Sequence, residues 1–153
     1  MIASVAHWTA CTEAEGPGRR FALWFQGCPL RCPGCCNPEM LPFEGGALVP
    51  VAELAERVFD ALERYRVEGI TLLGGEPLAH AAAAATLATL VRRRGLSVMV
   101  FTGYTLAEAR QLPEPAVADL LELTDILVDG PYSRDQPETR RRWRGLRGNG
   151  SCR

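Results

Sequence analysis

Short apolar runs alternate with helical segments over most of this chain. The β-rich runs are residues 21–25, 69–73, 96–101 and 125–130. From Val51 to Tyr65 apolar residues recur every three or four positions, which predicts an amphipathic helix. An alanine-rich helix is expected from about His80 to Arg94, and Thr105 begins a third helical segment. Strands that alternate with helices predict right-handed βαβ units and a parallel sheet.

The length of the chain limits how far such a sheet can curl. The chain has 153 residues, whereas a closed eightfold barrel needs about 250. We therefore expect an α/β fold, an open partial (β/α) barrel with a mainly parallel sheet, in one domain over residues 1–153. Residues 2–6 are expected to form a short edge strand, and residues 37–50 are interpreted as a linker rich in proline and glycine. Residues 134–153 contain seven arginines and predict either a flexible, solvated tail or a docking surface for an acidic partner.

The composition argues against several classes of function. A formal net charge of -1 gives no basic field for nucleic acid. No apolar run approaches the roughly 20 residues of a membrane span, and no basic segment followed by a long apolar core begins the chain. Four of the six cysteines lie within residues 28–36, too close together to staple distant parts of a secreted fold. We expect a cytoplasmic protein that binds neither nucleic acid nor membranes.

Three cysteines, Cys28, Cys32 and Cys35, stand at intervals of four and three residues directly after the first apolar run. Prolines and a glycine keep this stretch from becoming a helix, so its thiolates can turn toward one metal centre. A structural zinc site needs four ligands, usually as two separated pairs, and no second pair follows. An iron–sulfur cube held by three cysteines would keep one iron open to an outside ligand. The spacing by itself leaves both kinds of metal site open.

Polar and glycine-rich segments follow the later strands. In parallel α/β folds chemistry gathers at the carboxyl ends of the strands, where the segments 74–77 (Gly-Gly-Glu-Pro) and 102–104 (Thr-Gly-Tyr) and the residue Asp129 are expected. Glycines there allow a ligand to approach the backbone. Taken alone, each segment is equally an ordinary turn at the end of a strand.

The cysteine spacing resembles the Cys-x-x-x-Cys-x-x-Cys loop of the radical S-adenosylmethionine enzymes, and Gly-Gly-Glu-Pro on the next parallel strand resembles their second motif. Residues 15–133 resemble the activating enzymes of glycyl radical proteins, and among them the small activating proteins of anaerobic ribonucleotide reductases. The resemblance implies a radical-SAM partial barrel in which Cys28, Cys32 and Cys35 bind a [4Fe-4S] cluster. It also implies S-adenosylmethionine as cofactor, and the positions that it suggests for cofactor binding are Gly34, Cys36, Asn37, Gly74, Gly75, Glu76, Pro77, Thr102, Gly103, Tyr104 and Asp129.

The same resemblance implies the reaction. The reduced cluster cleaves S-adenosylmethionine to methionine and a 5′-deoxyadenosyl radical, which takes a hydrogen atom from a glycine of a glycyl radical enzyme, expected to be anaerobic ribonucleotide reductase. A flavodoxin- or ferredoxin-type protein is the implied electron donor, and no catalytic side chain is needed beyond the cluster and cofactor. Two alternatives are a radical enzyme acting on a peptide or small molecule in a biosynthetic pathway, and a zinc-binding interaction module.

Two positions depart from the family pattern. Position 36 is usually aromatic in this branch, and here it is Cys36. Because neighbouring residues of an extended chain point in different directions, we prefer Cys36 as a small packing residue or free thiol to a fourth ligand. The C-terminal segment also diverges, since only Trp143, Arg144, Gly145 and a displaced Asn149 agree with the usual ending.

Overall fold

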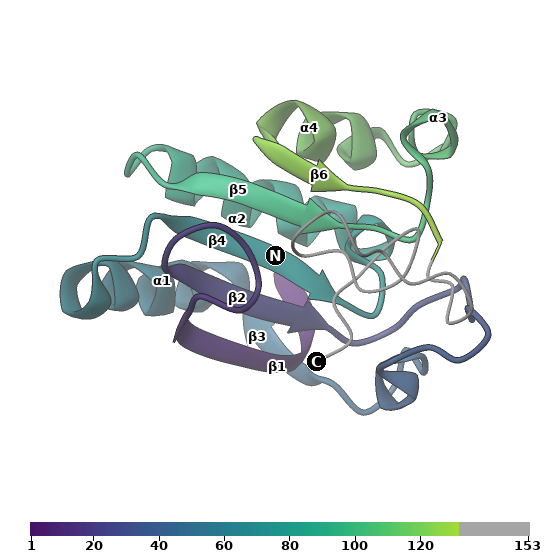
Figure 1. Ribbon diagram of the computed structural model, residues 1–153, viewed down its shortest axis with the longest axis horizontal. Coiled ribbons are helices and arrows are strands. Elements are labelled where there is room, and N and C mark those ends of the chain that lie inside the picture. Colours follow the sequence, from purple (N-terminus) through teal and green to yellow (C-terminus); the bar gives the residue numbers. More distant parts are fainter. Residues whose placement is uncertain (132–153) are drawn as a thin grey trace.

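The computed structural model describes residues 1–131 of the chain, so the arginine-rich tail predicted at residues 134–153 lies outside the described part. Six strands form one sheet in the spatial order β3-β1-β2-β4-β5-β6 (Figure 1). Their bounds are Ile2–Thr12 (β1), Arg20–Phe25 (β2), Ala47–Pro50 (β3), Gly69–Gly74 (β4), Ser97–Phe101 (β5) and Ile126–Val128 (β6). No helix among residues 1–131 is both long and apolar enough to cross a membrane.

The sheet is mainly parallel, as the alternation of strands and helices predicts. β2 pairs with β4, β4 with β5 and β5 with β6, all in parallel. Their arrowheads point the same way in Figure 1, so the carboxyl ends of four strands meet along one edge. This edge holds the segments that the sequence placed at strand ends.

The amino-terminal strand differs from expectation. β1 was expected to be a short strand at the sheet edge, but it runs for 11 residues and lies between β2 and β3, antiparallel to both. β3 falls in the stretch interpreted as a linker. The four residues of β3 are too few to show the alternation of apolar and polar side chains that predicts a strand. Pro50 and the two glycines before β3 are typical of loops, so the pairing of β3 with β1 decides its conformation.

Three longer helices cover one face of the sheet, lying behind the strands in the view of Figure 1. They are α1 (Val51–Tyr65), α2 (Ala81–Arg92) and α4 (Pro115–Leu123), with one turn of helix at α3 (Leu106–Ala109) and 3₁₀ turns at η1 (Pro38–Met40) and η2 (Pro77–His80). Helix α2 starts at Ala81 because η2 occupies the residues before it. The expected capping box is present, with the Thr105 side chain accepting from the Glu108 N–H and the Glu108 side chain accepting from the Thr105 N–H.

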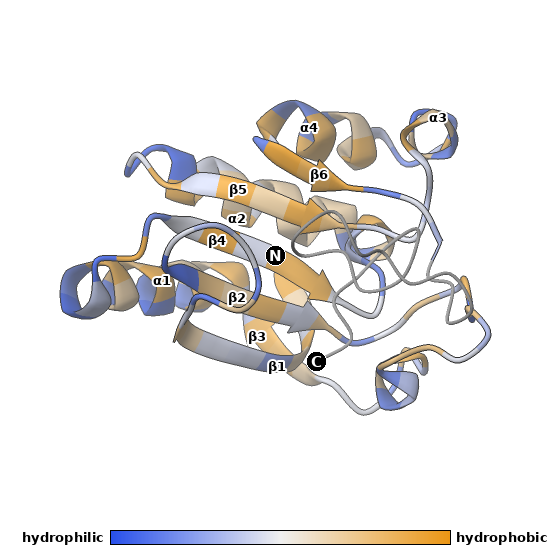
Figure 2. Cartoon of the chain, in the orientation of Figure 1, coloured by the Kyte–Doolittle hydropathy of each residue, from blue (hydrophilic) through white to orange (hydrophobic). Residues whose placement is uncertain are grey.

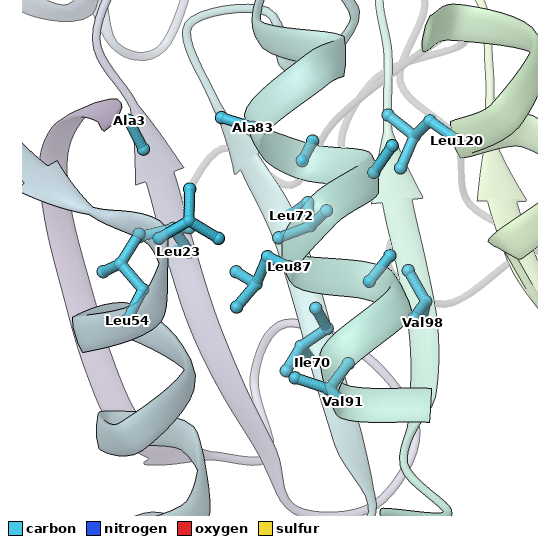
Figure 3. Packing of buried hydrophobic residues seen from close by; sticks show 14 of the residues in the cluster. Ala3, Leu23, Leu54, Ile70, Leu72, Ala83, Leu87, Val91, Val98 and Leu120 are labelled. Atoms are coloured by element: carbon cyan, nitrogen blue, oxygen red, sulfur yellow. The ribbon is translucent and has the colours of Figure 1, made fainter. Parts of the chain in front are cut away.

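The main core lies between these helices and the sheet. Leu54 of α1 and Leu87 of α2 are fully buried against Leu23 of β2 and Leu72 of β4 (Figure 3). Alanines in α2 permit close packing on the strands, and Ala84 and Ala88 have no exposed surface. In Figure 2, orange apolar residues lie along β2, β4, β5 and β6, and blue hydrophilic residues gather in the outer turns. Because the apolar faces of the helices cover one face of the sheet, only the opposite face and the strand ends are open to a functional site.

The opposite face of the sheet carries the alternate residues of the same strands. A smaller apolar cluster forms there from Ala22, Leu73, Met99, Phe101 and Val128, with Trp24 and Ile126 packed against it. Toward the amino-terminal ends of the strands this face is closed by Arg20, a buried residue. Residues 13–19, which join β1 to β2, curl in front of the face (Figure 1), and Gly16 there lies against Arg20 and Met99.

Asp125, just before β6, ties two strands and a helix together. Its carboxylate accepts from the Val98 N–H at 2.8 Å and pairs with Arg92 of α2 at 2.6 Å. Partial burial acts to raise the pKa of Asp125, but the hydrogen bonds from Arg92 and Val98 and the charges of Arg92 and Arg20 outweigh it, so the pKa lies below its ordinary value. An acid whose pKa is lower in the folded state stabilises that state at neutral pH and loses the contribution as pH falls.

Asp125→Asn is expected to lower the free energy of unfolding by about 0.5–1 kcal/mol at pH 7, because the pair is partly exposed and screened. Urea denaturation at pH 7, 5 and 3 should show the difference from wild type shrinking once pH falls toward and below 4. Asp60→Asn, at an exposed position of α1, is the control. A difference that persists undiminished at pH 3 would contradict an electrostatic origin.

Candidate active site

A pocket opens where the ends of β2, β4 and β5 meet. The residues that line it come from the cysteine loop, from the segment after that loop and from the two following strand ends: Cys28, Leu30, Cys32, Cys35, Cys36, Asn37, Leu41, Leu73, Gly74, Gly75, Glu76, Phe101 and Gly103. Nine of these were singled out in the sequence. Residues up to 75 positions apart in the chain therefore share one hollow.

The cysteine loop is held by backbone hydrogen bonds to the turn η1 and the segment after it. The N–H of Gly27 donates to the Met40 carbonyl at 2.8 Å, and that of Cys28 donates to the Leu41 carbonyl at 3.0 Å. The Gln26 side chain, itself buried, donates to two further carbonyls of this segment, those of Glu39 and Pro42. The loop is thus fixed at its start by residues that follow its last cysteine.

Two residues of the loop itself lie in the left-handed region, Arg31 at φ 49° and Gly34 at φ 71°. Glycine adopts this conformation freely, but an arginine there is strained by about 1 kcal/mol or more. The strained residue lies between Leu30 and Cys32, both of which line the pocket. Such strain persists only where the surroundings determine the conformation, and it often marks a functional loop.

The Gly-Gly-Glu-Pro segment packs directly on the start of the cysteine loop. The Gly75 N–H donates to the Phe25 carbonyl and the Glu76 N–H donates to the Gly27 carbonyl, each at 2.9 Å. A Cβ on Gly74 would lie 2.6 Å from the Phe25 nitrogen, and one on Gly75 would overlap the Gly27 carbonyl. Both glycines are therefore required by the close approach of two backbones, whatever else approaches them.

Glu76 joins the ends of β4 and β5 through its carboxylate. Oε1 accepts from the Thr102 hydroxyl at 2.8 Å and from the Leu78 N–H at 3.0 Å, while Oε2 accepts from the Gly103 N–H at 2.9 Å. The residue is only 1% exposed. Burial raises the pKa of Glu76 despite the three hydrogen bonds, which act to lower it. The carboxylate thus holds the Thr-Gly-Tyr segment in place against Gly-Gly-Glu-Pro.

The three candidate metal ligands are free thiols, with Cys28 buried and Cys32 and Cys35 half-buried. Burial raises the pKa of the Cys28 thiol, and the charge of nearby Glu76 acts in the same direction, while the N–H groups of Leu30 and Arg31 act against it. Within residues 1–131, no three His, Cys, Asp or Glu side chains lie close enough to hold a single metal ion. The three thiols instead line a shared hollow.

Five of the residues expected to bind cofactor are not among those that line the pocket: Gly34, Pro77, Thr102, Tyr104 and Asp129. Pro77 is buried at the start of η2, and the fully buried Thr102 donates its hydroxyl to Glu76, which lines the pocket. Asp129 accepts from the Leu106 N–H at 2.8 Å, at the first turn of α3. Their proposed contact with cofactor stays a prediction.

Cys36 and Asn37 do line the pocket. Cys36 is not among the free cysteines and has a partner, so the interpretation of it as a free thiol is wrong. Its side chain is small and half-buried, and the preference for a packing role over that of a fourth ligand stays a prediction.

Sequence reasoning missed the apolar wall of the pocket. Leu30, Leu41, Leu73 and Phe101 line it beside the cysteines, and only the alternation of Leu73 and Phe101 along their strands could have indicated this. Behind the cysteine loop the His80 ring stacks on Phe25, with centroids 5.1 Å apart. Burial lowers the pKa of His80, although hydrogen bonds with the backbone of Gly27 and Gln26 act to raise it.

Comparisons with known proteins identify the family of the chain. Residues 14–149 match the family described as a 4Fe-4S single cluster domain. The chain is 30% identical over 139 residues to the anaerobic ribonucleoside-triphosphate reductase-activating protein of Enterobacteria phage T4, which covers 88% of this chain and 84% of that protein. It is 32% identical over 138 residues to the protein of the same name from Escherichia coli K12, covering 86% of each.

Among solved structures, the fold resembles the crystal structure of QueE from Escherichia coli. The TM-score is 0.51 at 19% identity, over 69% of this chain and 54% of that one. The chain thus spans about half the length of QueE. At this identity the likeness supports the fold alone.

Proposed function

Because this chain belongs to the 4Fe-4S single cluster domain family and to the anaerobic ribonucleoside-triphosphate reductase-activating proteins, we propose that it is a radical S-adenosylmethionine enzyme that generates a glycyl radical on anaerobic ribonucleotide reductase. The observation that carries the proposal is the pocket itself. Three free cysteines and the Gly-Gly-Glu-Pro segment line one hollow at the carboxyl ends of parallel strands.

The donor set fits an iron–sulfur cluster. Cys28, Cys32 and Cys35 supply three thiolates, the ligand type that such clusters require. A cluster of four irons is larger than one ion, so its ligands need to surround a hollow rather than converge on a point. Three ligands leave one iron for S-adenosylmethionine, the role that the family resemblance gives to the cofactor. The match to a 4Fe-4S family weighs against the zinc-binding module.

The chain's own residues have three tasks in this scheme. Leu30, Leu73 and Phe101 give the pocket an apolar wall that excludes water. Glu76 positions the ends of β4 and β5 through its hydrogen bonds. The glycine backbones beside the cysteines offer main-chain polar groups to an amino acid moiety. When bound, the cluster and S-adenosylmethionine would supply the redox chemistry, which is the donation of one electron, the cleavage of a carbon–sulfur bond with release of methionine, and the acceptance of a glycine hydrogen atom by the adenosyl fragment.

The substrate that we propose is a protein. The names of the relatives refer to an activating protein of anaerobic ribonucleoside-triphosphate reductase, and the substrate atom would be a glycine hydrogen of that enzyme. A protein that docks over the mouth of the pocket would close the site against water. A flavodoxin- or ferredoxin-type donor is proposed on the resemblance alone.

The test is anaerobic and uses the full chain. The protein is reconstituted with iron and sulfide, reduced with dithionite and mixed with S-adenosylmethionine and the anaerobic ribonucleotide reductase of the same organism. We expect 5′-deoxyadenosine together with the electron paramagnetic resonance signal of a glycyl radical. Formation of 5′-deoxyadenosine without a radical on any glycyl radical enzyme of that organism would favour a peptide or small-molecule substrate. A colourless protein with bound zinc and no product would favour the binding module.

A further inference from the structure

Leu30 of the cysteine loop lies against Gly103, just after the end of β5. A Cβ built on Gly103 would overlap Cδ1 of Leu30, while its distance to Oε2 of Glu76 would be an ordinary 3.5 Å. Both residues line the pocket. The missing side chain at position 103 therefore provides the space that the Leu30 side chain occupies.

A hydrogen bond to Glu76 also holds the backbone of Gly103 in place. Its N–H donates to Oε2 of Glu76, whose own N–H donates to the Gly27 carbonyl at the start of the cysteine loop. Gly103 is buried and is not among the glycines in the left-handed region. An alanine there meets no conformational penalty, so its effect would come from the space it takes.

We propose that Leu30 is a positioning residue that rests on Gly103 and so sets the distance between the cysteine loop and the end of β5. The proposal rests on the proposed function, since the cofactor would lie between these two segments. Leu30 connects to the ligands through strained Arg31, which separates it from Cys32. A displacement of Leu30 therefore moves the loop or intrudes on the pocket, without breaking the core, because only the far end of a flexible side chain has to shift.

The experiment combines Gly103→Ala with Leu30→Ala. S-adenosylhomocysteine serves as a probe that cannot be cleaved to a radical, and its dissociation constant is measured by calorimetry on the reconstituted protein. Iron content and melting temperature are recorded for each variant. Gly103→Ala is expected to weaken binding about tenfold or more, the size of effect that overpacking a tight site produces. Iron content should stay at the wild-type level.

A double-variant comparison separates positioning from a general structural effect. Leu30→Ala alone removes the contact and should also weaken probe binding, and the loss in the double variant Gly103→Ala/Leu30→Ala should be smaller than the sum of the two single losses, because both changes act through one contact. Adding Leu41→Ala is the matched control, since Leu41 also lines the pocket but is not among the nearest neighbours of Gly103. Unchanged binding by Gly103→Ala or by Leu30→Ala, or a loss in their double variant equal to the sum of the single losses, would overturn the proposal, whereas the loss from Leu41→Ala should add to that of Gly103→Ala. A wild-type protein that holds its cluster but binds no probe would overturn the proposed function instead, and the positioning role with it.

Discussion

Cys32→Ala is expected to abolish cluster binding and with it 5′-deoxyadenosine formation. Three thiolates are the protein's whole contribution to the proposed cluster, and a cube with only two protein ligands would be exposed and easily lost. After reconstitution we expect iron and sulfide below about a tenth of the wild-type content and product at background. Iron analysis, the visible absorption spectrum and the product assay measure these quantities.

The fold should survive this substitution. Cys32 is half-buried in a loop, and its carbonyl can accept from the Cys35 N–H whatever the side chain. The apo variant should therefore melt within a few degrees of the apo wild type. Cys11→Ala is the matched control, because Cys11 is also a free, half-buried thiol but packs against the main core from β1. Normal iron content and activity in Cys32→Ala would remove this cysteine from the ligand set.

Much of the site could be predicted because it depends on order along the chain. Parallel strands joined by helices place every strand's carboxyl end at the same edge. Given strands that end at Phe25, Gly74 and Phe101, the following residues had to meet. The cysteine spacing and Gly-Gly-Glu-Pro then indicated which of those residues are proposed to hold the cluster and cofactor.

The side-chain contacts that position the segments of the site could not be predicted from the order of the strands along the chain. The role of Glu76 depends on the distance between two strand ends, and a sequence pattern holds no information on where a carboxylate points. Leu30 reads as an ordinary residue between cysteines, and its contact with Gly103 appears only when the loop is folded back. β3 was missed for a related reason, since its four residues become a strand only through pairing with β1.

Arg20 is the clearest case of a residue whose importance the sequence concealed. The apolar run in the sequence begins only at residue 21, yet Arg20 is the first residue of β2 and is only 2% exposed. Its guanidinium donates to the Thr71 hydroxyl at 2.8 Å, the Ile70 carbonyl at 2.7 Å and the Ser97 hydroxyl at 3.0 Å. Burial lowers the pKa of Arg20, and the charges of Glu68 and Asp125 oppose that shift. One side chain thereby links β2, β4 and β5 at the end of the sheet opposite the pocket.

Arg20→Met is expected to lower the free energy of unfolding by about 3 kcal/mol or more, because hydrogen bonds to a charged group are worth roughly 1.5–3 kcal/mol each and their acceptors would stay buried without a donor. Urea denaturation of the apo protein, followed by circular dichroism, measures the change. Arg19→Met is the matched control. Arg19 is exposed and its side chain donates to the Tyr65 carbonyl at 3.1 Å, so a loss within about 1 kcal/mol is expected. Equal losses in the free energy of unfolding for Arg20→Met and Arg19→Met would show that the buried hydrogen bonds of Arg20 contribute no more than a surface contact. The alignment of the strand ends that form the pocket would then depend on the apolar core alone.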